Sequence, residues 1–278
     1  MTITRVAALQ MVSGNCLQEN LIVAERLIGE AAKEGAKLLV LPETFAQFGT
    51  RLQKPLGHEE AFGDSVVRPF VTQQAKRHGV WIVAGSIPLS PMLNSERVLA
   101  ACYVVDDQGN ECARFDKLHL FDVDVGDQQG SYRESDTFIA GEQVVVVPTP
   151  FGRLGLAICY DIRFPELFRA MFELGVDIVA VPAAFTLLTG RAHWLALLRA
   201  RAIENQCYII GANQGGQHSP SRTTSGESVI IDGWGTVLAQ ADSGESCVIA
   251  DVDLKKLQRQ RLAMPIKQHQ RFSVIKKE

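Results

Sequence analysis

The strongest constraint on the fold is an alternation of short apolar runs with an amphipathic segment, which predicts strands separated by helices. In the first half of the chain the apolar runs lie at residues 6–11, 38–41 and 80–87. Apolar residues repeat with helical spacing between the first two runs, at Leu21, Ala24, Ile28 and Ala31. A weaker helical pattern covers residues 65–77. This alternation predicts an α/β protein.

A predicted hairpin ends the first part of the chain, and the second half repeats the alternation. A turn composition at residues 107–110 joins two strand-like segments, 97–105 and 111–117, so the predicted sheet is mixed. Further strands are expected at residues 144–148, 154–158, 178–181, 207–212, 229–232, 237–239 and 247–252. Helices are expected at residues 165–174 and near 193–204, where the second begins at His193.

The organisation of the chain favours one domain. A length of 278 residues allows one large domain or two small ones, and no linker composition separates the two halves. With 46% hydrophobic residues, the chain has enough apolar surface for a large core. We therefore expect a four-layer α-β-β-α sandwich of two mixed β-sheets, with a core over about residues 4–253 and a tail over 254–278.

Charge and hydropathy exclude several partners. The 28 basic and 31 acidic residues form no block of five like charges, so nucleic acid is not an expected partner. The longest apolar stretch, residues 178–188, is interrupted by Pro182 and is too short to span a membrane.

The first residues lack the pattern of a signal peptide, and the six cysteines lack tight spacing. We expect a cytoplasmic protein with reduced cysteines.

A polar stretch over residues 118–141 has no secondary-structure period, and loops of this length are often functional. Its acidic residues do not match a calcium loop, because Arg133 stands where such a loop needs an acid. The chain has no Cys-x-x-Cys or His-x-Glu pair and no glycine-rich phosphate motif. No metal and no cofactor are expected.

Cys159 lies where a nucleophile is often found, between a predicted strand and a predicted helix that begins at Pro165. Backbone N–H groups at this position are expected to lower the thiol pKa and to stabilise an oxyanion. The alternative interpretation of Cys159 is a small buried apolar residue.

Two further ionisable residues follow predicted strands. Glu43 comes directly after an apolar run, at the sheet edge where α/β proteins place their sites, and is a candidate general base. Lys117 ends the segment 111–117 and can stabilise both a thiolate and an oxyanion if it lies near Cys159. Taken singly, Glu43 is more often a solvated or capping residue, and Lys117 is more often a surface lysine.

Glu43, Lys117 and Cys159 together resemble the Glu-Lys-Cys triad of the nitrilase superfamily, the carbon-nitrogen hydrolases. The segments that carry the resemblance are residues 39–44 (Leu-Val-Leu-Pro-Glu-Thr), 114–121 (Arg-Phe-Asp-Lys-Leu-His-Leu-Phe) and 155–166 (Gly-Leu-Ala-Ile-Cys-Tyr-Asp-Ile-Arg-Phe-Pro-Glu). Residues 182–185, 193–194 and 199–206 are similar to the family as well, so the resemblance covers about residues 6–253.

The resemblance implies further site residues and an assembly. It implies a second glutamate that positions the lysine, for which Glu134 is the candidate and Glu142 the second choice. The residues expected at the substrate are Tyr160, Arg163, Phe185 and His193. Among these, the Tyr160 N–H would hold the oxyanion, and Arg163 would meet a substrate carboxylate, with an ion pair to Glu166 as the alternative. A homodimer with the C-terminal tail at its interface is also implied.

The resemblance implies an amidase that hydrolyses small omega-amides, such as deaminated glutathione or 2-oxoglutaramate, through a thioester. Tyr160 and Asp161 after Cys159 are similar to amidases rather than to nitrilases, while residues 225–228 (Ser-Gly-Glu-Ser) depart from the related pattern at the pocket edge. The alternatives are an N-carbamoyl amino acid amidohydrolase or nitrilase, a papain-like enzyme with His119 or His193 as base, and a catalytically silent binding protein.

Overall fold

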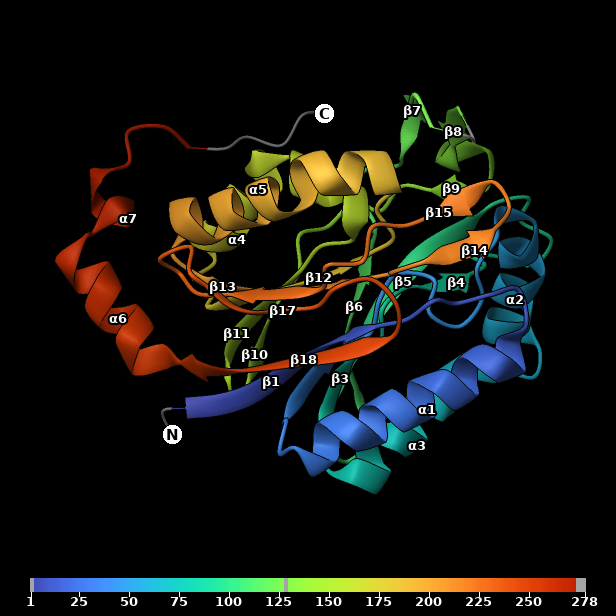
Figure 1. Ribbon diagram of the computed structural model, residues 1–278, viewed down its shortest axis with the longest axis horizontal. Coiled ribbons are helices and arrows are strands. Elements are labelled where there is room, and N and C mark those ends of the chain that lie inside the picture. The colour runs from blue at the N-terminus through green and yellow to red at the C-terminus, as the bar shows by residue number, and fades with distance from the viewer. Residues whose placement is uncertain (1–2, 128–129, 274–278) are drawn as a thin grey trace.

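Two mixed sheets form the centre of the computed structural model, which describes residues 3–127 and 130–273 (Figure 1). The first sheet contains β1 (Ile3–Gln10), β2 (Leu38–Val40), β3 (Trp81–Val83), β4 (Ile87–Leu89), β5 (Val98–Val105), β6 (Glu111–Asp116), β9 (Phe138–Ile139) and β18 (Ser246–Asp253). The second contains β10 (Val146–Thr149), β11 (Gly152–Leu156), β12 (Ile178–Ala183), β13 (Tyr208–Asn213), β16 (Val229–Ile231) and β17 (Val237–Gln240).

Each sheet has a parallel centre and mainly antiparallel outer strands, although β9 pairs parallel with β5 in the first sheet. In the first sheet β1, β2 and β3 run parallel, and in the second β11, β12 and β13 do so. The last strand, β18, returns to the first sheet and pairs antiparallel with β1. The C-terminal part of the chain therefore links both sheets.

Helices cover the outer face of each sheet, which gives the expected four-layer α-β-β-α sandwich (Figure 1). The helices are α1 (Leu17–Lys33), α2 (Thr50–Phe62), α3 (Val67–His78), α4 (Pro165–Glu173), α5 (Leu187–Asn205), α6 (Leu254–Ala263) and α7 (Ile266–His269). α1 and α3 lie on the first sheet, and α4 and α5 lie on the second. Two small hairpins stand outside the sheets, formed by β7 (Asp122–Asp124) with β8 (Ser131–Arg133) and by β14 (Gln217–Ser219) with β15 (Arg222–Thr223).

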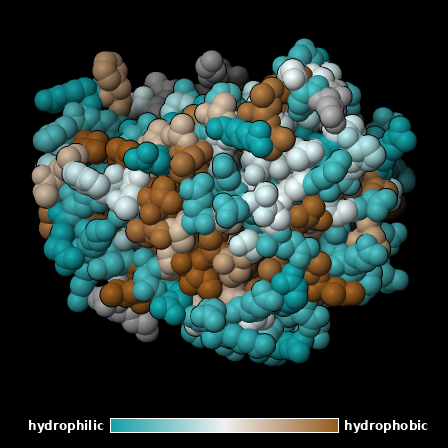
Figure 2. Space-filling view, viewed as in Figure 1, coloured by the Kyte–Doolittle hydropathy of each residue, from teal (hydrophilic) through white to brown (hydrophobic). Residues whose placement is uncertain are grey.

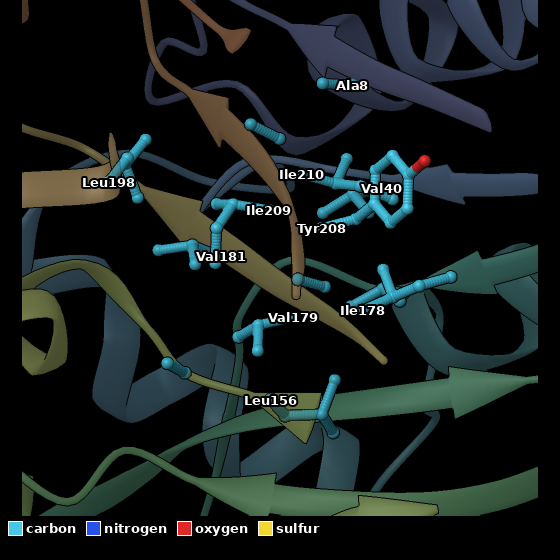
Figure 3. Packing of buried hydrophobic residues seen from close by; sticks show 14 of the residues in the cluster. Ala8, Val40, Leu156, Ile178, Val179, Val181, Leu198, Tyr208, Ile209 and Ile210 are labelled. Atoms are coloured by element: carbon cyan, nitrogen blue, oxygen red, sulfur yellow. The ribbon is translucent and has the colours of Figure 1, made fainter. Parts of the chain in front are cut away.

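Side-chain alternation along the strands builds the layers. In β1, Ala8 belongs to the core between the sheets, whereas Leu9 packs with α1 on the other face. Figure 3 shows Ala8 and Val40 of the first sheet in the same apolar cluster as Val179 and Ile210 of the second. Burial of both faces explains why the central strands read as continuous apolar runs.

Two predicted elements have other bounds in the structure, and one helix was not predicted. The run 80–87 is two strands, because Gly85 adopts φ 52° and a Cβ there would lie 2.1 Å from the Pro42 carbonyl oxygen. α2 was not predicted, since Pro55 lies inside it and its apolar residues lack a clear period. α5 begins at Leu187 rather than at His193, because the Thr186 hydroxyl accepts the Thr189 N–H and caps the helix.

The polar stretch and the tail predicted from sequence both contain regular secondary structure. Within residues 3–127 and 130–273, no helix is long and apolar enough to cross a membrane. The polar stretch 118–141 contains β7, β8 and β9, although residues 128 and 129 lie outside the described part. The predicted tail forms α6 and α7, and residues 274–278 of it also lie outside the described part.

Candidate active site

Lys117 is the centre of a buried charge cluster at the end of β6. Its Nζ donates to Glu43 Oε1 at 2.8 Å and to both carboxylate oxygens of Glu134 at 2.8 and 2.9 Å. The Lys117 and Glu43 side chains are 2% and 8% exposed, so the cluster is shielded from water. The second carboxylate predicted next to the lysine is thus Glu134, while Glu142 is exposed on the surface.

The two carboxylates decide the protonation of Lys117. Burial opposes its charge, but Glu134 and Glu43 outweigh that effect and hold the Lys117 pKa well above its usual value. Burial also raises the pKa of Glu134, and the positive charge of Lys117 reduces this rise. The Phe121 N–H donates to Glu134 Oε2 at 2.6 Å and fixes the carboxylate against the ammonium. The ammonium is therefore charged and held in one place.

Cys159 stands at a sharp turn beyond β11. It has a φ of 49°, a left-handed conformation that costs about 1–3 kcal/mol for a residue other than glycine and is frequent at functional sites. The thiol lies close enough to Glu43 and to the backbone N–H of Ala184 for both to influence its pKa. The turn thus directs Cys159 from the second sheet to the carboxylate of the first.

The thiol pKa differs from the sequence prediction. Burial and the Glu43 charge raise the Cys159 pKa well above its usual value, and they outweigh the lowering effects of Lys117 and of the Ala184 N–H. The predicted lowering was wrong because the sequence shows the favourable backbone position but not the depth of burial. Burial and the Glu43 charge both favour the protonated thiol, so a nucleophilic Cys159 would need a nearby base.

The backbone around Glu43 is fixed from both sheets. The next residue, Thr44, has a φ of 52° and its N–H donates to Ser86 Oγ at 2.9 Å. Gln214, which follows β13 of the second sheet, donates from Nε2 to the Glu43 carbonyl at 3.0 Å. These bonds hold the carboxylate at the seam between the sheets.

A cavity of about 600 Å³ opens above the cluster, which is large enough for a small organic substrate. Cys159, Lys117, Glu43 and Glu134 all line it. Its other charged and aromatic lining residues are Phe48, Phe121, Tyr132, Arg133, Phe138, Tyr160, Phe185, His218 and Arg222. Several aromatic rings thus line the cavity beside its polar groups, as is common for small-molecule sites.

Arg222 is a cation of the cavity wall that sequence reasoning missed. Its guanidinium donates to the Tyr132 hydroxyl at 2.7 Å and to the Ala184 carbonyl at 3.0 Å, and it lies over the Tyr132 ring. A guanidinium has five N–H donors, of which these two contacts use two. No motif marked Arg222, because its approach to Cys159 depends on the hairpin of β14 and β15.

The four predicted substrate residues divide into two pairs. Tyr160 and Phe185 line the cavity. Arg163 and His193 contact each other at 3.2 Å, and the Arg163 guanidinium lies over the Tyr160 and Phe185 rings. Arg163 thus flanks the cavity wall, and the predicted alternative of an ion pair with Glu166 is absent from the ion pairs of the described residues.

Neither histidine proposed as an alternative base contacts the thiol. His119 Nδ1 lies 2.7 Å from Asp161 Oδ1, and its ring stacks on Phe164. His193 lies beside Arg163. Within the part of the chain that the structure describes, no three His, Cys, Asp or Glu side chains are grouped to hold a metal ion.

Comparisons with known proteins match this fold along its whole length. The yeast protein Nit3, described as a member of branch 10 of the nitrilase superfamily, superimposes with a TM-score of 0.86 at 29% identity and covers 98% of this chain and 97% of its own. The Caenorhabditis elegans NitFhit protein gives a TM-score of 0.89 at 35% identity over 98% of this chain, which spans 66% of that fusion protein. The fold is that of the nitrilase superfamily.

Sequence comparisons define the family more narrowly. The carbon-nitrogen hydrolase family matches residues 5–262. A deaminated glutathione amidase of Yersinia enterocolitica is 42% identical over 96% of this chain and 93% of its own, and one of Bos taurus is 37% identical over 96% of this chain and 81% of its own. The chain belongs to the carbon-nitrogen hydrolase family and is an amidase, so the papain-like alternative does not apply.

Proposed function

We propose that this protein hydrolyses small omega-amides, such as deaminated glutathione or 2-oxoglutaramate, with Cys159 as nucleophile. The observation that carries the proposal is the contact of a buried thiol with Glu43, which itself binds the Lys117 ammonium at 2.8 Å. Nucleophile, base and cation thus face one cavity. The similarity to proteins named deaminated glutathione amidase supports this substrate class.

In the first half-reaction Cys159 Sγ attacks the amide carbon while Glu43 takes the thiol proton. Lys117 and the Tyr160 N–H stabilise the oxygen that becomes negative, and donors of this kind are typically worth about 10²- to 10³-fold in rate. The carbon–nitrogen bond then breaks, and Glu43 gives its proton to the departing nitrogen. The products are an amine, or ammonia from a primary amide, and a thioester on Cys159.

In the second half-reaction water attacks the thioester carbon. Glu43 takes a proton from the water and returns it to the departing Cys159 sulfur, so the acid is released and the enzyme is restored. The sum is one amide and one water giving one carboxylic acid and one amine. Glu134 acts through Lys117, whose charge and direction it maintains throughout.

We propose that a cation binds the carboxylate at the far end of the substrate. Arg222 lines the cavity and Arg163 flanks it behind Tyr160 and Phe185, so both are candidates. Arginine suits the role because its planar donors match a carboxylate. Phe185 would shape the wall, and His193 would hold Arg163 in place.

The proposal is tested by hydrolysis of deaminated glutathione, 2-oxoglutaramate, an N-carbamoyl amino acid and a simple nitrile, with amine or ammonia release as the readout. Wild type should cleave one of the first two, and Cys159→Ala should lose at least about 10⁴-fold. Cys102→Ala, which removes a buried thiol outside the cavity, is the matched control. Activity confined to the carbamoyl compound or the nitrile would favour the alternative substrates, and no activity at all would favour a binding protein.

We further propose that the chain acts as one domain in a cytoplasmic homodimer whose interface includes the tail. Large apolar side chains are exposed on and near α6, with Leu262 at 81% and Trp234 at 62% exposure. Figure 2 shows apolar groups gathered near the middle of one face among hydrophilic ones. Sedimentation should give a dimer that Leu262→Glu weakens, and an unchanged mass would contradict this interface. Cell fractionation tests the location.

A further inference from the structure

Asp161 joins the loop that carries the nucleophile to the loop that carries the lysine. Its Oδ2 accepts the Ile158 N–H at 2.9 Å, next to Cys159 in the chain. Its Oδ1 accepts the backbone N–H of His119 at 3.0 Å, two residues after Lys117. The Asp161 side chain is fully buried. One carboxylate therefore ties together loops that come from different sheets.

The His119 ring completes this connection. His119 Nδ1 lies 2.7 Å from Asp161 Oδ1, and since a carboxylate accepts, Nδ1 is the donor. The ring stacks on Phe164 with 3.6 Å between the two ring centroids, and the His119 side chain is 30% exposed. His119 is not among the residues that line the cavity, and the thiol contacts are those with Glu43 and Ala184. The imidazole therefore orients the carboxylate and does not act on the substrate.

We infer that Asp161, oriented by His119, is a positioning residue that sets the separation between Cys159 and Lys117. This inference rests on the catalytic roles proposed above. The backbone of Lys117 is fixed on its own side by bonds with Ala100 and Gly141, and Asp161 adds a direct backbone link from the lysine loop to the nucleophile loop of the second sheet. Without that link, the lysine charge loses its fixed distance from the sulfur, and the thiolate and the oxyanion lose its stabilisation.

The test measures kcat, KM and the pH dependence of Cys159 alkylation by iodoacetamide in Asp161→Ala, Asp161→Asn and His119→Phe. Peptide mass spectrometry has to follow the alkylation, because Cys112 is exposed. Asp161→Ala should lower kcat by about 10- to 100-fold with little change in KM, and it should move the alkylation midpoint to higher pH. Asp161→Asn, which keeps an acceptor, should restore part of the loss. His119→Phe keeps the ring stack and should shift both readouts less, in the same direction.

Asp232→Asn is the matched control. Asp232 is also buried and its Oδ1 accepts two backbone N–H groups, from Trp234 and Thr236, but it lies outside the cavity lining. This variant should lower the melting temperature and leave kcat and the alkylation midpoint unchanged.

The inference is overturned if Asp161→Asn and His119→Phe fold and show wild-type kcat and alkylation, because Asp161 would then only cap the turn. These two variants decide the question even if Asp161→Ala does not fold. Failure of the proposed function is a separate result, since it would show as no amide hydrolysis by wild type or as retained activity in Cys159→Ala.

Discussion

The two sheets contribute different chemistry to the cavity. The first sheet and its loops supply the ionised groups, Glu43, Lys117 and Glu134, while the second supplies the thiol of Cys159 and the Ala184 amide. Both sheets use a residue in a left-handed conformation at the strand end, Thr44 in the first and Cys159 in the second. The site is therefore complete only where the sheets meet.

This division separates two properties that are easily confused, the reactivity of the thiol and the turnover of the amide. Glu43 raises the Cys159 pKa, whereas Lys117 lowers it. Both residues are nevertheless needed for the proposed reaction, one as base and one as oxyanion donor. Substitutions of Glu43 and of Lys117 should therefore change the reactivity of the Cys159 thiol in opposite directions. Both should lower the rate of amide hydrolysis.

Glu43→Gln should have the largest effect on turnover among the first-sheet variants. Loss of the general base should lower kcat by about 10²- to 10⁴-fold. Loss of the negative charge should at the same time lower the Cys159 pKa, so that iodoacetamide alkylates the thiol faster at neutral pH. Glu60→Gln, at a buried glutamate that binds backbone N–H groups of α3 outside the cavity, is the control. Slower alkylation in Glu43→Gln would contradict the division.

Lys117→Met should lower kcat by about 10²- to 10³-fold through loss of an oxyanion donor. Its alkylation should be slower than in wild type, because the charge that favours the thiolate is gone. The substitution also leaves two buried carboxylates without their cation, which should lower the free energy of unfolding by about 3–5 kcal/mol. Urea unfolding measures the stability. Unchanged stability together with faster alkylation of Cys159 would contradict the role given to the Lys117 charge.

Arg222→Met should weaken substrate binding more than Arg163→Met does, because Arg222 lines the cavity and Arg163 flanks it. Loss of a charged hydrogen bond corresponds to about a 10- to 100-fold decrease in kcat/KM for substrates with a distal carboxylate. The matched substrate is the same amide with that carboxylate replaced by a methyl group, on which both variants should equal wild type. A larger loss of kcat/KM in Arg163→Met than in Arg222→Met would show instead that Arg163 binds the substrate carboxylate.

His218 gives the smallest expected effect, on stability rather than on rate. Burial lowers its pKa from 6.5 to about 4, and the ring bridges the Ser13 carbonyl and the Thr224 hydroxyl. Below pH 6.5 the unfolded chain binds a proton that the folded protein excludes, so stability falls between pH 6.5 and 4, by at most about 3 kcal/mol. Urea unfolding over this range should show a shallower decline in His218→Gln. An equally steep decline would assign the acid sensitivity to other groups.

Much of the proposed site was predictable from sequence because Glu43, Lys117 and Cys159 each follow a predicted strand. Leu39, Val40 and Leu41 precede Glu43 as an apolar run, and their burial on both sides made the strand recognisable. Arg222 and Ala184 were not predictable, since a loop arginine and a backbone amide carry no pattern that distinguishes them from many others. The break at Gly85 was hidden in the same way, because apolar residues continue on both sides of Gly85 and Ser86.

The sequence by itself determined the alternation of the main strands and helices, the residues that follow those strands and the family that the motifs resemble. These follow from local periodicity and from residue types at fixed spacing, which do not depend on distant contacts. The tertiary structure alone decided that β18 returns to β1, that Arg222 reaches the cavity and that the Cys159 pKa is raised. Each of these depends on how deeply groups far apart in the chain are buried together, because burial and the distances between charges set the electrostatics of a site.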